Sequence, residues 1–174
     1  MQQKLSCSNR LDNCNGLLVG VSSQLLQRLQ VIQNAAARIV TGARRSEHMT
    51  PILRDLHWLP IRRRITFKTA VPVYKCLHDR APQYLQIYCE PTSTVATRRL
   101  RSAHSGRLTV PRTRTNYGDR SFTIQGPRVW NSLPAALRAP DITLTTFKNK
   151  LKTFCSTCNS SYSAFAAFWR LCSI

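Results

Sequence analysis

The sequence predicts a mainly α-helical protein, and three observations support this. Apolar residues recur every three to four positions over residues 24–39, the spacing that lines one face of a helix. Signals for a helix end and for a new helix follow this stretch. Gly42 is typical of a residue just after a helix, and Thr50-Pro51 is typical of a helix beginning. A second, basic stretch with an apolar stripe covers residues 61–78. We therefore expect a helical hairpin plus a long basic helix, and a C-terminal amphipathic helix.

The first helix is predicted at about residues 22–41. Its apolar face carries Leu25, Leu29, Ile32, Ala36 and Ile39. Arg44 and Arg45 follow the glycine, where cations favour the negative end of a helix dipole.

Three further helices are predicted at about 50–57, 61–78 and 82–88. We expect Thr50 to cap the first of these and Pro51 to occupy its first turn. Pro72 falls inside the long helix, where it removes a hydrogen bond and costs about 3 kcal/mol or more. Either that helix kinks at Val71 or Pro72 is a damaging change.

Residues 91–120 differ in composition and predict a basic, flexible strap. Ser, Thr, Gly and Pro are frequent there, which is typical of loops. Asp119 is the one acid among many arginines. Two short stretches, 108–110 and 121–124, alternate at period two and could pair as a small β-hairpin.

The C-terminal part predicts a short helical turn carrying Trp130 and then a longer amphipathic helix. Asp141 or Thr143 could cap that last helix. Its apolar face would carry Leu144, Phe147, Leu151 and Phe154.

The charge of the chain points to a polyanionic partner. The 174 residues include 26 Lys and Arg against 7 Asp and Glu, a formal net charge of +19. Such an excess attracts nucleic acid or an acidic membrane face. The alternative is a piece of a larger protein whose charge is balanced elsewhere.

Cysteine content and hydropathy predict an intracellular protein, in the nucleus or the cytoplasm. The number of cysteines, seven, is odd, and the polar N-terminus lacks the apolar core of a signal peptide. No run approaches the roughly 18 apolar residues of a membrane-spanning helix. We expect free thiols and no membrane partner.

Catalytic and metal-binding patterns are weak in this sequence. Polymerase chemistry needs paired aspartates that hold two metal ions, and the acids here are isolated. Cys155 and Cys158 form a CxxC without a second ligand pair at matched spacing, so two unrelated thiols are the simpler interpretation. His48 and His57 flank a short helix and are more typical of packing or capping residues than of ligands. We predict no enzyme activity, no metal and no cofactor.

Several short sequence motifs also occur in a recognisable order. They are Arg10–Leu18, Arg28–Gly42, His48–Ile65, Lys75–His78, Ala81–Leu85, Tyr117–Phe122, Pro127–Pro134 and Phe147–Lys152. Together, over roughly residues 9–155, they resemble the region that follows the polymerase domain in LINE-type (non-LTR) retrotransposons of the chicken-repeat and jockey-like groups.

This resemblance implies a division of the chain. Residues 1–21 would end a thumb-like segment, 22–90 would form the helical region, 91–120 the basic strap and 121–155 a small C-terminal subdomain. The tail, 156–174, departs from the family pattern. The parent protein would be an RNA-directed DNA polymerase, with its upstream polymerase domain as a partner, but this segment lacks the polymerase aspartates and the endonuclease.

Three functional hypotheses remain open from the sequence. The fragment could contact the backbone of RNA or DNA, it could be a partly folded product of a truncated element, or it could be a recruited RNA-binding module. Arginines at a helix start and along a mobile segment can donate several hydrogen bonds to phosphates. Few aromatic residues lie among these arginines, which favours backbone contacts over base stacking, and Trp58 and Trp130 are predicted core anchors. The predicted binding residues are Arg62, Arg63, Arg64, Lys68, Lys75, Arg98, Arg99, Arg101, Arg107, Arg112 and Arg114.

Overall fold

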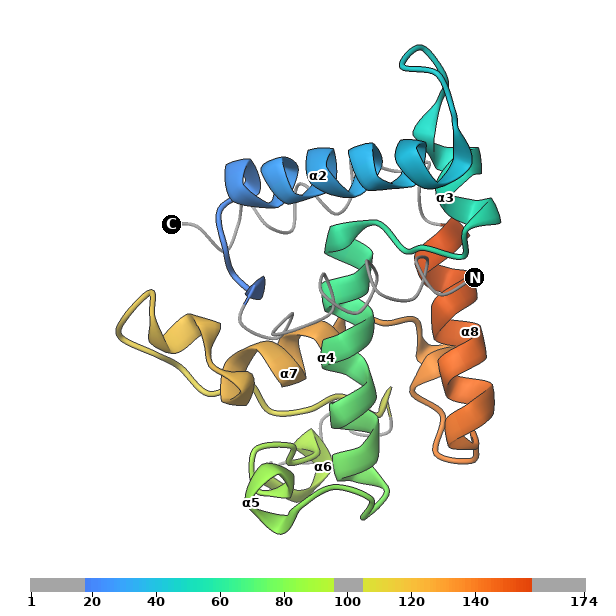
Figure 1. Ribbon diagram of the computed structural model, residues 1–174. Coiled ribbons are helices and arrows are strands. Elements are labelled where there is room, and N and C mark those ends of the chain that lie inside the picture. The colour runs from blue at the N-terminus through green and yellow to red at the C-terminus, as the bar shows by residue number, and fades with distance from the viewer. Residues whose placement is uncertain (1–17, 96–104, 158–174) are drawn as a thin grey trace.

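The computed structural model describes residues 18–95 and 105–157, and the described parts are mainly α-helical (Figure 1). This confirms the predicted fold class. One isolated antiparallel bridge joins Pro91 and Leu108. The helical elements are α2 (Ser23–Thr41), α3 (Met49–Asp55), α4 (Ile61–Leu77), α5 (Gln83–Gln86), α6 (Thr92–Val95), η3 (Gly118–Arg120), α7 (Phe122–Asn131), η4 (Ala135–Leu137) and α8 (Leu144–Thr157).

Helix α4 is the centre of the fold. Helices α7 and α8 pack along it, and α2 crosses near its N-terminal end (Figure 1). Ala70 and Val73 of α4 are fully buried in the main core, which also contains residues of α7 and α8. The predicted boundary at residue 121 therefore does not separate two cores, because residues 121–155 share theirs with α4.

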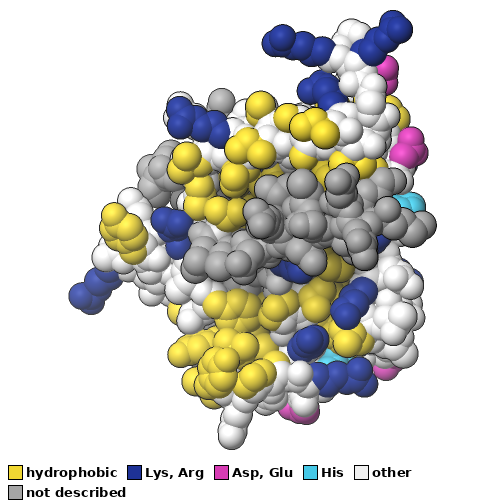
Figure 2. All heavy atoms as spheres, viewed as in Figure 1, with side chains coloured by type: hydrophobic (Ala, Val, Ile, Leu, Met, Phe, Trp, Pro, Cys, Tyr) yellow, Lys and Arg dark blue, Asp and Glu magenta, His cyan; other side chains and the backbone are white. Residues whose placement is uncertain are grey.

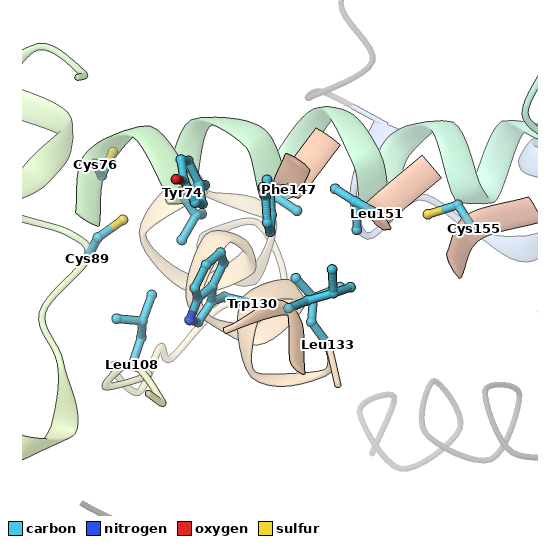
Figure 3. Close-up of a cluster of buried hydrophobic side chains, with 12 residues drawn as sticks. Tyr74, Cys76, Cys89, Leu108, Trp130, Leu133, Phe147, Leu151 and Cys155 are labelled. Atoms are coloured by element: carbon cyan, nitrogen blue, oxygen red, sulfur yellow. The ribbon is translucent and has the colours of Figure 1, made fainter. Parts of the chain in front are cut away.

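The main core is built around Phe147 of α8 (Figure 3). Its ring stacks on Tyr74, with centroids 4.4 Å apart and planes at 19°. Trp130 lies on it with centroids 5.8 Å apart. The Tyr74 hydroxyl donates a hydrogen bond to the Ile142 carbonyl oxygen, which satisfies its polar end inside the core. These contacts confirm Trp130 as a core anchor.

One of the two residues predicted to cap helix α8 does so. The Thr146 amide donates to Thr143 Oγ1 at 3.3 Å, so Thr143, and not Asp141, is the cap. Phe147 and Leu151 are fully buried, and Leu144 and Phe154 pack at the edge of the same core. The predicted apolar face of this helix is confirmed.

Helix α2 is oriented differently from what its apolar pattern suggests. An amphipathic helix ordinarily buries its apolar stripe. Here Leu25, Ile32 and Ile39 are 50%, 56% and 84% exposed. The buried positions lie one residue further along the chain, at Leu26, Gln33 and Ala37. The helix is thus rotated so that a polar residue, Gln33, faces the protein, where its side chain forms a hydrogen bond with Leu59.

Helix α3 ends in a backbone motif that leaves His57 in the left-handed region. Its φ is +56°, which is uncommon for a residue with a side chain. The His57 amide donates to the Arg54 carbonyl and the Trp58 amide to the Leu53 carbonyl, at 2.9 and 2.8 Å. This is the Schellman pattern, and it places Trp58 against Leu53 in one buried cluster. Trp58 is confirmed as a core residue.

Two local predictions are corrected. Helix α3 begins at Met49 after His48, so Thr50 lies inside the helix and does not cap it. The predicted β-hairpin does not form, because 122–124 belong to helix α7 and Leu108 pairs with Pro91. The short alternating stretch at 121–124 was too short to separate a strand from the first turn of a helix.

Both interior prolines are contained within continuous helices. Helix α4 runs through Pro72 to Leu77, and α7 runs through Pro127 to Asn131. Each proline removes one backbone hydrogen bond. Pro127 is fully buried, so the packing of its ring offsets the backbone hydrogen bond that its nitrogen cannot donate.

Candidate nucleic-acid interface

Two glutamines of α2 fix the start of α4, where the predicted arginines begin. Gln33 Nε2 donates to the Leu59 carbonyl at 2.9 Å. The Ile61 amide donates to Gln30 Oε1 at 2.9 Å, and Gln30 Nε2 donates to Gln33 Oε1 at 3.0 Å. One of the unpaired amides at the α4 N-terminus is thereby satisfied. This explains why α2 turns a polar face inward.

The two glutamines place Arg62 beside the beginning of α2. Ser23, Gln24, Gln27, Arg28 and Arg62 line one shallow, open hollow. Neither α2 nor α4 has an acidic residue in its first turn. Arg28 and Arg62 are exposed, and the positive ends of both helix dipoles lie in this region. Such an arrangement can accept a phosphate group.

The triple arginine does not form a single surface. Arg62 is exposed and Arg63 is half-buried, but Arg64 is only 7% exposed. Consecutive helical residues point about 100° apart, so three in a row cannot share one face. Arg64 is therefore removed from the predicted exposed set and is part of the packed face of α4.

The other predicted residues of α4 are divided in the same way. Lys68 is exposed, whereas Lys75 in the last turn is half-buried. Arg64, Lys68 and Lys75 therefore do not form a continuous exposed basic stripe along α4.

Part of the predicted strap is attached to the core. The Asn131 side chain forms two hydrogen bonds of 2.8 Å with the backbone of Leu108, accepting from its amide and donating to its carbonyl. Trp130 Nε1 donates to the Gly106 carbonyl at 2.9 Å. Arg107, between these two attachment points, is exposed and is held on a fixed backbone.

The remaining strap arginines fall into two groups. Arg112 and Arg114 are exposed in the segment before η3. Arg98, Arg99 and Arg101 lie outside the described residues.

Arg138 has a structural role that the sequence did not indicate. Its Nη1 donates to the Ser105 carbonyl at 2.6 Å and its Nε to the Leu133 carbonyl at 3.2 Å. Burial, and secondarily the charge of Arg107, lowers the pKa of the Arg138 guanidinium. Ser105 is distant from Arg138 in sequence, so no local pattern could have revealed this contact. Arg138 thereby holds the backbone at Ser105 next to the end of η4.

On the face that Figure 2 presents, basic side chains are spread out instead of gathering in one patch. Figure 2 shows Lys and Arg at several separate places on one face, with few acids among them. Asp119 is engaged by Arg128, with the Arg128 Nη2 to Asp119 Oδ1 distance at 3.3 Å. An interface of this kind would use dispersed contacts to a backbone.

The described residues do not contain a metal-binding cluster. In residues 18–95 and 105–157, no three His, Cys, Asp or Glu side chains gather as metal ligands would. His48 and His57 are both exposed. None of the helices in these ranges is long and apolar enough to cross a membrane.

Comparison with known proteins adds no relative. No protein-family description, no curated protein and no solved structure matches the chain.

Proposed function

We propose that this chain binds the phosphate backbone of RNA or DNA, with little sequence preference, as a non-catalytic C-terminal piece of a LINE-type retrotransposon protein. The single observation that carries the binding proposal is the hollow that both Arg28 and Arg62 line. It combines two exposed guanidinium groups and two helix N-termini without a nearby acid in either first turn. The family origin rests on the sequence resemblance described above.

The distribution of charge supports backbone contacts over base readout. Arg107, Arg112, Arg114 and Lys68 are also exposed, and they are spread over several elements. Dispersed cations neutralise phosphates individually, and each one neutralised releases counterions and steepens the salt dependence of affinity. An interface of this kind does not depend on the identity of the bases.

The test is a salt titration of affinity with an RNA hairpin and a DNA duplex of equal length. The double variant Arg28→Ala/Arg62→Ala should weaken binding to both and reduce the salt slope by about one for each phosphate that is no longer neutralised. Arg54→Ala, at an exposed arginine of α3, is the matched control and should change the slope less. An unchanged slope in the double variant would exclude the hollow as the site.

One alternative is a partly folded product of a truncated element, which does nothing. The closely packed aromatic core around Phe147 favours a folded module instead. Thermal unfolding followed by circular dichroism separates the two, because a packed core predicts a cooperative transition. A broad transition that RNA does not shift would favour the partly folded product.

A further inference from the structure

Two buried cysteines lie next to each other at one end of the main core. Cys76 lies in the last turn of α4, and Cys89 follows α5. They are 5% and 4% exposed, and both are free thiols. Both belong to the main core cluster. Figure 3 shows both side chains at the same edge of the cluster, with the sulfur of Cys89 directed toward Cys76.

We propose that Cys76 and Cys89 form a reversible disulfide that ties the end of α4 to the α5 segment. The oxidant we name is a low-molecular-weight disulfide, such as glutathione disulfide. In the balanced reaction, the two protein thiols lose two protons and two electrons and form one S–S bond. The small disulfide takes up both and is released as two thiols.

The geometry favours this pair. The two side chains lie next to each other in one buried cluster (Figure 3), and disulfide formation requires their Cβ atoms to approach within about 3.5–4.5 Å. Whichever thiolate attacks the small disulfide, the other cysteine resolves the mixed disulfide.

Burial makes oxidation of the two thiols slow and dependent on the amount of oxidant. Desolvation raises the pKa of both thiols, that of Cys89 to about 12. The thiolate is the reactive form, so few molecules react at neutral pH unless the oxidant is abundant. The pair would remain reduced in a reducing compartment and close only under oxidising conditions.

The closed loop would contain an exposed apolar surface. Tyr84, Ile87 and Tyr88 are 66%, 58% and 40% exposed, and all three lie between the two cysteines. A disulfide would fix this segment against α4 and restrict its conformations. This inference does not depend on the proposed nucleic-acid binding.

The experiment uses the full chain with four other cysteines replaced, as Cys7→Ser, Cys14→Ser, Cys158→Ser and Cys172→Ser. Cys155, which is 1% exposed at the other end of the cluster, is kept as an internal control. The folded protein is equilibrated in glutathione buffers of increasing oxidised fraction, alkylated with N-ethylmaleimide and digested with trypsin without reduction. Cleavage after Lys75, Arg80 and Arg98 releases peptides 76–80 and 81–98.

The expected result is a linked 76–80/81–98 species that grows with the oxidised fraction, while Cys155 is not cross-linked. The same treatment in denaturant should spread cross-links over all three cysteines, because folding no longer selects the pair. The oxidised protein should also melt several degrees higher than the reduced one. Cys89→Ala and Cys76→Ala should each abolish the linked species.

The proposal is overturned if the folded chain, shown to melt cooperatively, keeps both thiols unlinked in the most oxidising buffer. It is equally overturned if the native and denatured chains give the same cross-link pattern.

Discussion

The side-chain amide of Gln33 donates a hydrogen bond to the carbonyl oxygen of Leu59 at 2.9 Å, across the junction between α2 and α4. Gln33 is fully buried, and its Oε1 accepts from Gln30, which in turn holds the Ile61 amide. This relay sets the direction in which α4 begins, and with it the position of Arg62.

The first prediction follows from this relay. Gln33→Leu keeps a similar volume but leaves the Leu59 carbonyl without its partner and removes one of the two acceptors of Gln30 Nε2, so the free energy of unfolding should fall by about 1–3 kcal/mol. Gln24→Leu, at an exposed position of the same helix, is the control and should change it by less than about 0.5 kcal/mol. Urea unfolding measures both, and a neutral Gln33→Leu would contradict the structural role of the relay.

A second prediction contrasts the apolar stripe of α2 with the residues that the structure buries. Leu26→Ala removes a side chain that is 7% exposed and should cost about 2–4 kcal/mol. Ile39→Ala changes one that is 84% exposed and should stay within about 0.5 kcal/mol. The two unfolding curves, compared in urea, decide which face is packed, and the reverse order would support the orientation that the apolar pattern suggests.

Local signals in the sequence predict some of these features, whereas contacts between distant residues decide the others. Helix ends were predictable because glycine, proline and hydroxyl residues act locally, as at Gly42 and Thr143. The face of α8 was predictable because its apolar residues are its only buried ones. The face of α2 was not, because Gln33 is buried through partners in a different helix, far along the chain.

The candidate site was only partly predictable for the same reason. Composition indicated a polyanion partner, and Arg62 is exposed as expected. The exposure of each arginine depends on helix packing, which buries Arg64. Arg28 was missed because it becomes a neighbour of Arg62 only when α2 and α4 pack together.

A third prediction separates these arginines. Arg64→Met retains an apolar stem and removes a buried guanidinium, so it should change the free energy of unfolding by about 1 kcal/mol or more in either direction, as replacing a buried charge commonly does. Arg62→Met should leave stability within about 0.5 kcal/mol and reduce the salt slope of RNA binding by about one. Unfolding and salt titration are measured on both variants. If Arg64→Met alters only the salt slope of RNA binding and not the stability, Arg64 acts at the surface. That result would contradict its burial against the rest of the protein.

A fourth prediction concerns the left-handed residue at the end of α3. His57 has φ +56°, a conformation that glycine adopts without cost. His57→Gly should therefore raise the free energy of unfolding by up to about 1 kcal/mol, and the β-branched His57→Val should lower it by about 1–2 kcal/mol. Because the His57 side chain is exposed, lost packing is a small part of either change. Equal melting temperatures for the glycine and valine variants would argue against this backbone conformation.

The last prediction is the pH dependence that the buried Cys89 thiol imposes. Burial, and secondarily the charge and hydrogen bond of Cys76, raises the pKa of Cys89 from 9.0 to about 12. Above pH 9 the unfolded chain therefore loses the Cys89 proton before the folded chain does, so folding stability declines with rising pH. The contribution is fully present below pH 9 and is lost as the pH approaches about 12. Cys89→Ala lacks this proton but shares the lysines and tyrosines that also titrate at high pH. The difference in unfolding free energy between the reduced wild-type chain and Cys89→Ala should therefore shrink steadily when urea unfolding is measured at increasing pH above 9. A constant difference over that range would show that Cys89 is solvated in the folded protein and that the thiol pair is not buried.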